Sequence, residues 1–300
     1  MQPHTLVKTA VIPVAGLGTR MLPATKAIPK ELLPVTDKPL IQHVVEEAIE
    51  AGITQIILVT RSGKEAIENH FDAHFELETQ LEKKGKDIVL KSIKDIVPSN
   101  IQVISVRQPE ALGLGHAILC ASNIVRNQPF AVLLPDVLVT PPSSDISAND
   151  LSSMVNLWNN TGHSQIMVEA VPENKIHLYG IADIGSTTLG MGESTPISSM
   201  IEKPLKDEAP SNLAVVGRYI LPPQIMSILK KVKPGAGGEI QLTDAIDLLL
   251  KDHEVNAYRM QSSTHDCGNK AGYVMANIAV GLKHPEIRDE LKLYMESLVN

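Results

Sequence analysis

Short aliphatic runs alternate with segments of helical period along the first half of the chain, and this order restricts the fold more than any other feature. The runs that predict strands cover residues 10–14, 55–60, 101–106 and 130–134. The segments that predict helices cover residues 40–50, 64–70, 75–84 and 115–125. A repeated β-α order indicates a parallel, doubly wound sheet, because each crossover returns the chain to the same edge. Such sheets bind ligands at the carboxyl ends of their strands.

The second half has a different texture and predicts a part that is rich in strands. Strand-like runs separated by Gly, Pro and Asn cover residues 165–171, 180–184, 197–202 and 212–221. Helices at 222–231 and 241–251, a strand at 255–260 and two C-terminal helices are expected to follow. We therefore expect an α/β fold, Rossmann-like, with a mixed and mainly parallel sheet flanked by helices and a smaller β-rich part. Residues 141–142 and the Ser/Asp/Asn cluster after them fit a linker or a loop, and we favour a loop within a single domain.

Charge and cysteine content exclude several classes of protein. The net charge of −7 and a pI of about 5.8 provide no basic field for binding nucleic acid. Cys120 and Cys267 are the only cysteines, so a disulfide framework or a cysteine-rich zinc site is not expected. No signal-peptide pattern and no apolar run of roughly 18 residues is present. These features predict a cytoplasmic protein without a membrane segment.

The loop after the first strand, AGLGTRMLPATKAIPK, combines glycines, prolines and cations. Gly16 and Gly18 let backbone N–H groups approach a ligand, although a glycine pair alone fits an ordinary tight turn equally well. Arg20 matches the geometry of phosphate oxygens, and Lys26 and Lys30 add positive charge. The prolines stiffen the backbone and reduce the entropy cost of holding it in place. The loop is therefore a candidate cradle for phosphates.

The same loop is not a dinucleotide-binding fingerprint. That fingerprint needs a third glycine where Met21 stands, and a P-loop needs a Gly-Lys-Ser/Thr sequence that is absent. A nicotinamide-dependent dehydrogenase is therefore excluded.

Three further motifs carry chemistry, and each also has a purely structural interpretation. Gln108 can pair with a pyrimidine edge, while the Gly113 turn near it also fits the start of a helix. Asp136, after a buried strand, can hold Mg²⁺ or can cap the next turn. Glu202-Lys203 is either a ligand-binding pair or a solvated surface pair. From the residues alone these alternatives stay open.

The loop AGLGTRMLPATKAIPKELLPV resembles the signature loop of the sugar-nucleotide pyrophosphorylases. Similarity continues through VRQPEALGLGHAIL, LLPDV, IEKP and HDCGNKAGY, over about residues 8–285. The resemblance implies a nucleotidyltransferase with Mg²⁺ as cofactor, in which glucose 1-phosphate attacks UTP in line to give UDP-glucose and pyrophosphate. It also implies a homo-oligomer, either a dimer or a tetramer. Residues 8–160 would bind the nucleotide and 161–270 the sugar phosphate, with C-terminal helices over 271–300.

The resemblance also assigns roles to individual residues. The predicted catalytic residues are Arg20, Asp136 and Lys203. The predicted metal ligands are Asp136 and Asp266. The predicted nucleotide-binding residues are Ala15, Gly16, Gly18, Thr19, Lys26, Glu31, Gln108 and Gly113. The predicted sugar-phosphate-binding residues are Gly180, Glu202, Lys203 and Gly217.

One departure from the family leaves alternatives for the function. Gly238 stands where the family usually carries Asp, and some relatives act as regulatory subunits with little turnover. The presence of Arg20, Asp136 and Lys203 favours a catalyst over such a subunit. A second alternative is a glucose-1-phosphate thymidylyltransferase that uses dTTP, since uracil and thymine differ by one methyl group, worth about 1–3 kcal/mol.

Overall fold

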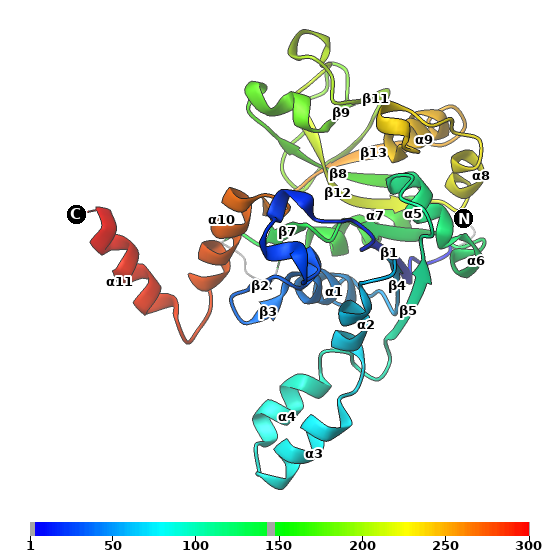
Figure 1. Ribbon diagram of the computed structural model, residues 1–300. Helices are drawn as coiled ribbons and strands as arrows, with labels where there is room; N and C mark the ends of the chain where they lie inside the picture. Colours follow the sequence, from blue (N-terminus) through cyan, green and yellow to red (C-terminus); the bar gives the residue numbers. More distant parts are fainter. Residues whose placement is uncertain (1–3, 143–147, 300) are drawn as a thin grey trace.

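The computed structural model describes residues 4–142 and 148–299, and its centre is a single twisted sheet (Figure 1). The strands follow the order β10-β13-β8-β12-β6-β1-β4-β5, and β9 and β11 join beside β12. The expected cluster at 143–147 lies outside the described residues. In the first half β6, β1, β4 and β5 are parallel, as the β-α order predicts. Their bounds are Phe130–Leu133, Thr9–Pro13, Gln55–Thr60 and Gln102–Arg107.

Strand β12 (Leu213–Leu221) joins the two halves of the chain. It runs antiparallel to β6 on one side and to β8 on the other, while β13 lies parallel to β8. The sheet is therefore mixed, and the expected α/β fold is confirmed. The other strands of this half are β8 (Ser164–Ala170), β9 (Gly180–Asp183), β10 (Ser194–Pro196), β11 (Ser199–Glu202) and β13 (Val255–Arg259).

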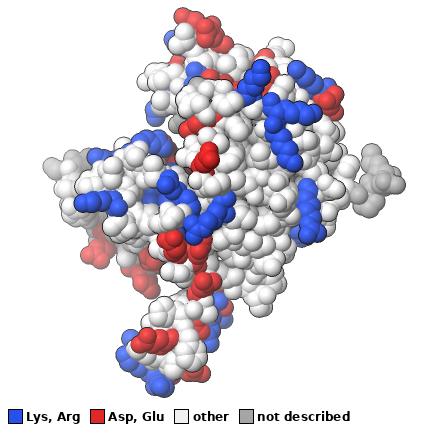
Figure 2. Space-filling view, turned by 45° about the vertical axis from the view of Figure 1, so that its right-hand side comes forward, with Lys and Arg blue, Asp and Glu red and all other residues white. Residues whose placement is uncertain are grey.

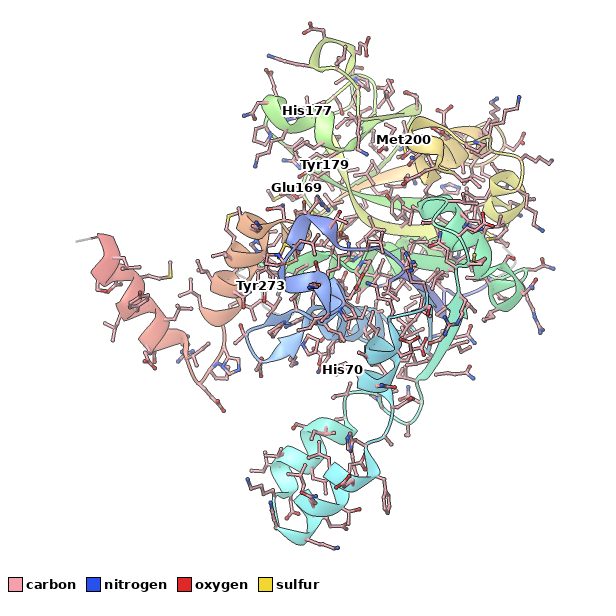
Figure 3. All side chains as sticks on the ribbon, viewed as in Figure 1. His70, Glu169, His177, Tyr179, Met200 and Tyr273 are labelled. Carbon is pink, nitrogen blue, oxygen red and sulfur yellow. The ribbon has the colours of Figure 1, made fainter. Side chains whose placement is uncertain are left out.

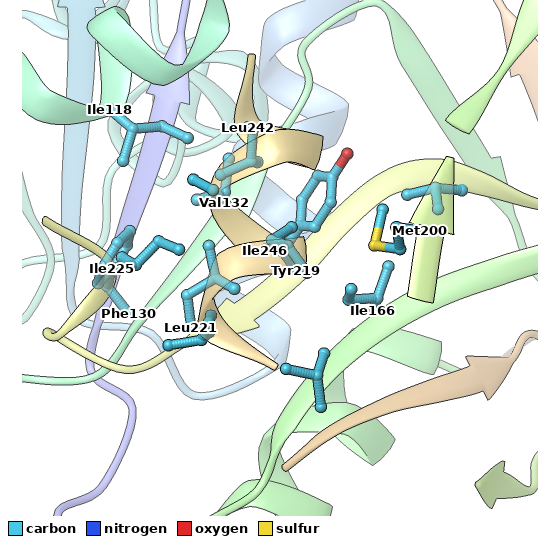
Figure 4. Packing of buried hydrophobic residues seen from close by; sticks show 14 of the residues in the cluster. Ile118, Phe130, Val132, Ile166, Met200, Tyr219, Leu221, Ile225, Leu242 and Ile246 are labelled. Atoms are coloured by element: carbon cyan, nitrogen blue, oxygen red, sulfur yellow. The ribbon is translucent and has the colours of Figure 1, made fainter. Parts of the chain in front are cut away.

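Helices cover both faces of the sheet because successive residues of each strand point to opposite sides. Val11 of β1 belongs to the core beneath α5, α8 and α9, whereas Ala10 and Ile12 belong to the core beneath α1 and α7. Figure 4 shows the first of these cores, with Leu242 and Ile246 of α9 beside Tyr219 of β12. These helices are α1 (Leu40–Glu50), α5 (Leu114–Cys120), α7 (Asp150–Thr161), α8 (Ile225–Leu229) and α9 (Leu242–Leu249).

Two helical segments extend away from the sheet in Figure 1. One is the hairpin of α3 (Phe75–Lys83) and α4 (Asp87–Lys94), and the other is α11 (Arg288–Val299), which follows α10 (Lys270–Gly281). The remaining helices are α2 (Glu65–Phe71) and α6 (Ser122–Val125). Within the described ranges, no helix has both the length and the hydropathy needed to cross a membrane.

Two small sheets complete the fold. Strands β2 (Pro34–Val35) and β3 (Lys38–Pro39) form a hairpin, and β7 (Val137–Thr140) pairs antiparallel with β14 (Ser263–Asp266). The second pairing brings residues far apart in the sequence to the carboxyl end of β6, where the candidate site lies.

Candidate active site

The loop after β1 folds into three short 3-10 turns, at Thr19–Met21, Ala24–Lys26 and Lys30–Leu32. Gly18 has φ +68°, a left-handed conformation that favours glycine, and a Cβ there would lie 3.1 Å from Cβ of Lys30. The Thr25 hydroxyl donates to the Gly18 carbonyl at 2.7 Å. The loop is thus fixed against itself, so its cations have defined positions.

Four charged side chains meet where this loop faces the end of β6. Lys30 Nζ lies 2.6 Å from Asp136 Oδ2, and Arg20 Nη2 lies 3.6 Å from the same oxygen. Arg20 Nη1 is 3.5 Å from Asp266 Oδ2. Both cations come from the first loop, whereas the carboxylates come from the turn after β6 and from β14.

The pairing of β14 with β7 explains why the two carboxylates are neighbours. Asp266 stands opposite Val137 in the register, and the N–H of Cys267 donates to the Asp136 carbonyl at 2.8 Å. The N–H of Gly268 donates to Asp266 Oδ1 at 2.8 Å. A Cβ on Gly268 would lie 2.4 Å from Arg20 Nη2, so a larger residue there would displace the Arg20 side chain.

Asp136 is ionised at neutral pH. Burial by itself would raise its pKa, but the neighbouring Lys30 and Arg20 outweigh burial and bring the pKa below its ordinary value. The Asp136 side chain is 17% exposed, so it can still reach a ligand. A carboxylate that keeps its charge in this surrounding is a suitable ligand for a hard divalent cation.

The donor set at this point fits magnesium better than a metal held entirely by protein. No group of three or more His, Cys, Asp or Glu side chains suited to a metal occurs among residues 4–142 and 148–299. Asp136 and Asp266 would therefore supply two ligands at most. Mg²⁺ is bound in this way, by one or two carboxylates together with substrate phosphates and water.

Gln108 and Gly113 build the second turn of the site. Gln108 Nε2 donates to the Gly113 carbonyl at 3.1 Å and lies 3.2 Å from His116 Nδ1. Gly113 has φ +93°, and a Cβ there would lie 2.7 Å from Cβ of Glu239. The glycine is therefore required by both the backbone conformation and the close approach of the segment around Glu239.

Glu202 and Lys203 end β11 on the other side of the site. Glu202 Oε1 lies 3.2 Å from Lys203 Nζ, and Glu202 Oε2 accepts a hydrogen bond from the Thr243 hydroxyl at 2.7 Å. Gly180 stands opposite Glu202 in the β9–β11 register, where a Cβ would lie 3.1 Å from Oε2. Lys203 has φ +47°, an uncommon value for a residue with a side chain.

Tyr179 connects the two sides of the site. Its carbonyl accepts from the N–H of Lys203 at 3.0 Å. Burial raises the pKa of its phenol, and the carboxylates of Asp266 and Glu169 raise it further. Figure 3 shows Tyr179 and Glu169 near each other above the first loop. Tyr179 thus contacts the Glu202–Lys203 side through its backbone, and its phenol lies within the electrostatic influence of Asp266.

The remaining predicted residues take varied positions. Gly16, Thr19 and Lys26 are exposed on the first loop, and Ala15 is buried beneath it. Gly217 lies in β12 with φ +80°, at a shift in register, where a Cβ would be 2.8 Å from Leu134 Cδ1. On the face drawn in Figure 2, acidic and basic side chains are interspersed.

Glu31, which is predicted to bind the nucleotide, is a buried residue of the first loop. Its side chain has no exposed surface, and its Oε2 lies 2.6 Å from Lys64 Nζ, so in this arrangement it presents no atom to a ligand. Burial raises the pKa of Glu31 and lowers that of Lys64, and each partner opposes the effect on the other. This buried pair ties the first loop to the start of α2, which makes Glu31 a support for the loop.

Lys30 also belongs to the group of charges around Asp136, although the sequence predicted for it only a positive charge and no role of its own. It lies four residues after Lys26 in the same motif, and nothing in the spacing distinguishes the two. The structure does: Lys30 contacts Asp136, whereas Lys26 is exposed and has no ion pair within the described part of the chain.

Comparison with known proteins agrees with this arrangement. The family described as Nucleotidyl transferase matches residues 9–281. UTP--glucose-1-phosphate uridylyltransferase from Escherichia coli (strain K12) is 54% identical over 293 residues, which are 98% of this chain and 96% of that protein. A structure described as UTP-bound UGPase from Acinetobacter baumannii has a TM-score of 0.90 and 52% identity, and covers 98% of this chain and 100% of its own.

A second structure, described as UDP-glucose pyrophosphorylase complexed with UDP-glucose, has a TM-score of 0.82 and 40% identity. It covers 93% of this chain and 100% of its own. Because the family model matches most of the length of this chain, the chain belongs to the nucleotidyl transferase family.

Proposed function

We propose that this protein transfers the uridylyl group of UTP to glucose 1-phosphate, forming UDP-glucose and pyrophosphate. The observation that carries the proposal is the placement of Arg20 and Lys30 against Asp136 and Asp266. Two polyanionic substrates repel each other, so their reaction needs cations at fixed positions. The relatives named for this reaction, and the solved structures with UTP and with UDP-glucose, support the same assignment.

Asp136 and Asp266 would hold Mg²⁺. The metal, when bound, neutralises charge on the phosphate oxygens. Arg20 and Lys30 add positive charge from the protein at the same place, and Lys30 also keeps Asp136 ionised.

The other predicted residues bind and orient the two substrates. Gln108 and Gly113 form the turn for the base, and Glu202 and Lys203 hold the hydroxyls and the phosphate of the hexose. The sugar phosphate oxygen attacks the α-phosphorus of UTP directly, and the mechanism needs no covalent intermediate with the protein. In this division residues 8–160 serve the nucleotide, 161–270 the sugar phosphate, and 271–300 form C-terminal helices.

The remaining residues of the first loop complete the nucleotide side. Gly16 and Gly18 offer backbone N–H groups, Thr19 and Lys26 lie beside them, and Ala15 forms the floor. Gly180 and Gly217 leave room for the hexose. Cytoplasmic location and assembly into a dimer or tetramer stay predictions.

Gly238, the departure from the family pattern, lies in the segment that precedes α9. It has φ +75°, and a Cβ there would have no atom within 4 Å. In this left-handed conformation glycine is unstrained, whereas the aspartate usual in the family would be strained.

Release of pyrophosphate tests the proposal. Purified protein is mixed with glucose 1-phosphate, Mg²⁺ and either UTP or dTTP, and pyrophosphate is measured over time. We expect rapid release with UTP and slower release with dTTP. Faster release with dTTP would make the protein a thymidylyltransferase, and no release from folded protein would favour a regulatory subunit.

A further inference from the structure

Residues 235–243, which follow α8 and run into the first turn of α9, form a strap that contacts both sides of the site. At its centre the N–H of Ile240 donates to the Leu112 carbonyl at 2.8 Å, and the Ile240 carbonyl accepts from the N–H of Gly115 at 2.8 Å. These two hydrogen bonds clamp the strap onto the turn that contains Gly113. The position of the residues that follow Ile240 in the strap is therefore fixed.

The strap ends at Thr243, in the first turn of α9. The Thr243 hydroxyl donates to Glu202 Oε2 at 2.7 Å, while the other oxygen, Oε1, faces Lys203 Nζ at 3.2 Å. Leu242 and Ile246, on either side of Thr243 in the sequence, are buried in the core (Figure 4). The Thr243 hydroxyl thus belongs to a helix turn that is anchored by its buried neighbours.

The two donors to Glu202 are not equivalent. The Lys203 side chain is 59% exposed and is the proposed partner of the hexose phosphate, so a bound substrate competes for it. Thr243 is partly buried and uncharged, and it has no such second role. When substrate binds, Thr243 is the donor that still fixes the plane of the Glu202 carboxylate.

We propose that Thr243 is a positioning residue that sets how tightly, and with which hydroxyl pattern, the hexose phosphate binds. It acts through Glu202, whose free lone pairs point in directions decided by the hydrogen bond from Thr243. This inference rests on the proposed function, in which Glu202 accepts hydrogen bonds from the sugar hydroxyls. It adds a residue outside the β11 motif to the hexose side of the site.

The test compares Thr243→Val, which keeps the shape and removes the donor, with Thr243→Ser, which keeps the donor. KM is measured separately for UTP and for glucose 1-phosphate. We expect Thr243→Val to raise KM for glucose 1-phosphate roughly tenfold and KM for UTP by less than about twofold. Thr243→Ser should restore most of the loss. Thr79→Val, on α3 away from the site, is the matched control for exchanging Thr and Val in a helix.

A set of monodeoxy glucose 1-phosphates tests whether Thr243 acts through Glu202. The analogue that lacks the hydroxyl held by Glu202 should be used equally well by the wild type and by Thr243→Val. Equal rises in both KM values, unchanged KM values, or no rescue by serine would each overturn the inference. If the wild type itself releases no pyrophosphate from UTP and glucose 1-phosphate, the proposed function fails instead.

Discussion

At the scale of single residues, the two lysines of the first loop have different surroundings. Both are cations of one motif, and the resemblance to the family assigned only Lys26 to the nucleotide. Which lysine reaches the carboxylate depends on how the loop folds over Gly18, and a spacing of four residues does not encode that. Lys30 reaches Asp136 because the loop closes on itself, which brings Lys30 against Gly18.

Replacing Lys30 should therefore cost more activity than replacing Lys26. We expect Lys30→Met to lower kcat about 10²–10³-fold, the usual effect of losing one fixed donor to developing charge. Lys26→Met should change kcat much less, because Lys26 is exposed and makes no ion pair with any residue that the structure describes. Steady-state kinetics at saturating UTP and glucose 1-phosphate measure both. A larger loss for Lys26→Met would contradict this view of the loop.

The lowered pKa of Asp136 predicts how stability depends on pH. A carboxyl group with a lower pKa in the folded state stabilises the fold above its unfolded pKa, and this contribution disappears as the pH falls through the folded value. Metal-free wild type should thus exceed Asp136→Asn in melting temperature at about pH 6, and the difference should shrink below about pH 4. Thermal unfolding of both proteins across this range is the measurement. A constant difference would mean that Asp136 does not titrate as inferred.

At the scale of elements, most of the sheet and the helices that cover it could be predicted. Helix 40–50 and strand 55–60 agree with α1 and β4 residue for residue, because their apolar periodicity is clear. Helix α7 was missed because its sequence is rich in Ser and Asn, and its start depends on the Asn149 side chain accepting from the N–H of Ser152. Helix α4 was missed because it is short and exposed, with no buried side chain to mark its inner face.

Tertiary contacts also decide what the glycines do. Gly113 and Gly63 have similar positive φ values, but only Gly113 meets a neighbouring segment. We expect Gly113→Ala to raise KM for UTP, because the added methyl would displace either the turn or Glu239. Gly63→Ala is the matched control: it should cost about 1–2 kcal/mol of stability through backbone strain alone and leave KM unchanged. If the two variants have the same KM for UTP, the turn has no part in binding the nucleotide.

At the scale of the whole molecule, the proposed nucleotide and sugar-phosphate parts share one sheet through β12. The order of the strands beyond β6 could not be predicted from the sequence, because pairing across the sheet joins segments some 80 residues apart. Arg218 opposite Leu133 is an example. The approach of Asp266 to Asp136 depends in the same way on the long-range pairing of β14 with β7.

Because both parts of the chain share one sheet, we expect the protein to unfold in a single transition. Binding of UTP to the nucleotide part should stabilise the entire chain, by about 2.7 kcal/mol at a concentration of 100 times Kd. Calorimetry with and without UTP and Mg²⁺ should show a single peak that moves to higher temperature as a unit. Two peaks, of which only one moves, would show that the two parts unfold independently.

The position of β12 also decides whether the proposed nucleotide part could fold without the second half of the chain. Every side chain of β6 is buried, and one of its two edges is covered only by β12, from the second half of the chain. A fragment ending near residue 160 would present this apolar strand as an open edge, which is a template for association with other chains. Recombination between genes for different sugar nucleotides would therefore have to exchange loops around the site, since cutting the chain between its two halves would leave neither half with a complete sheet.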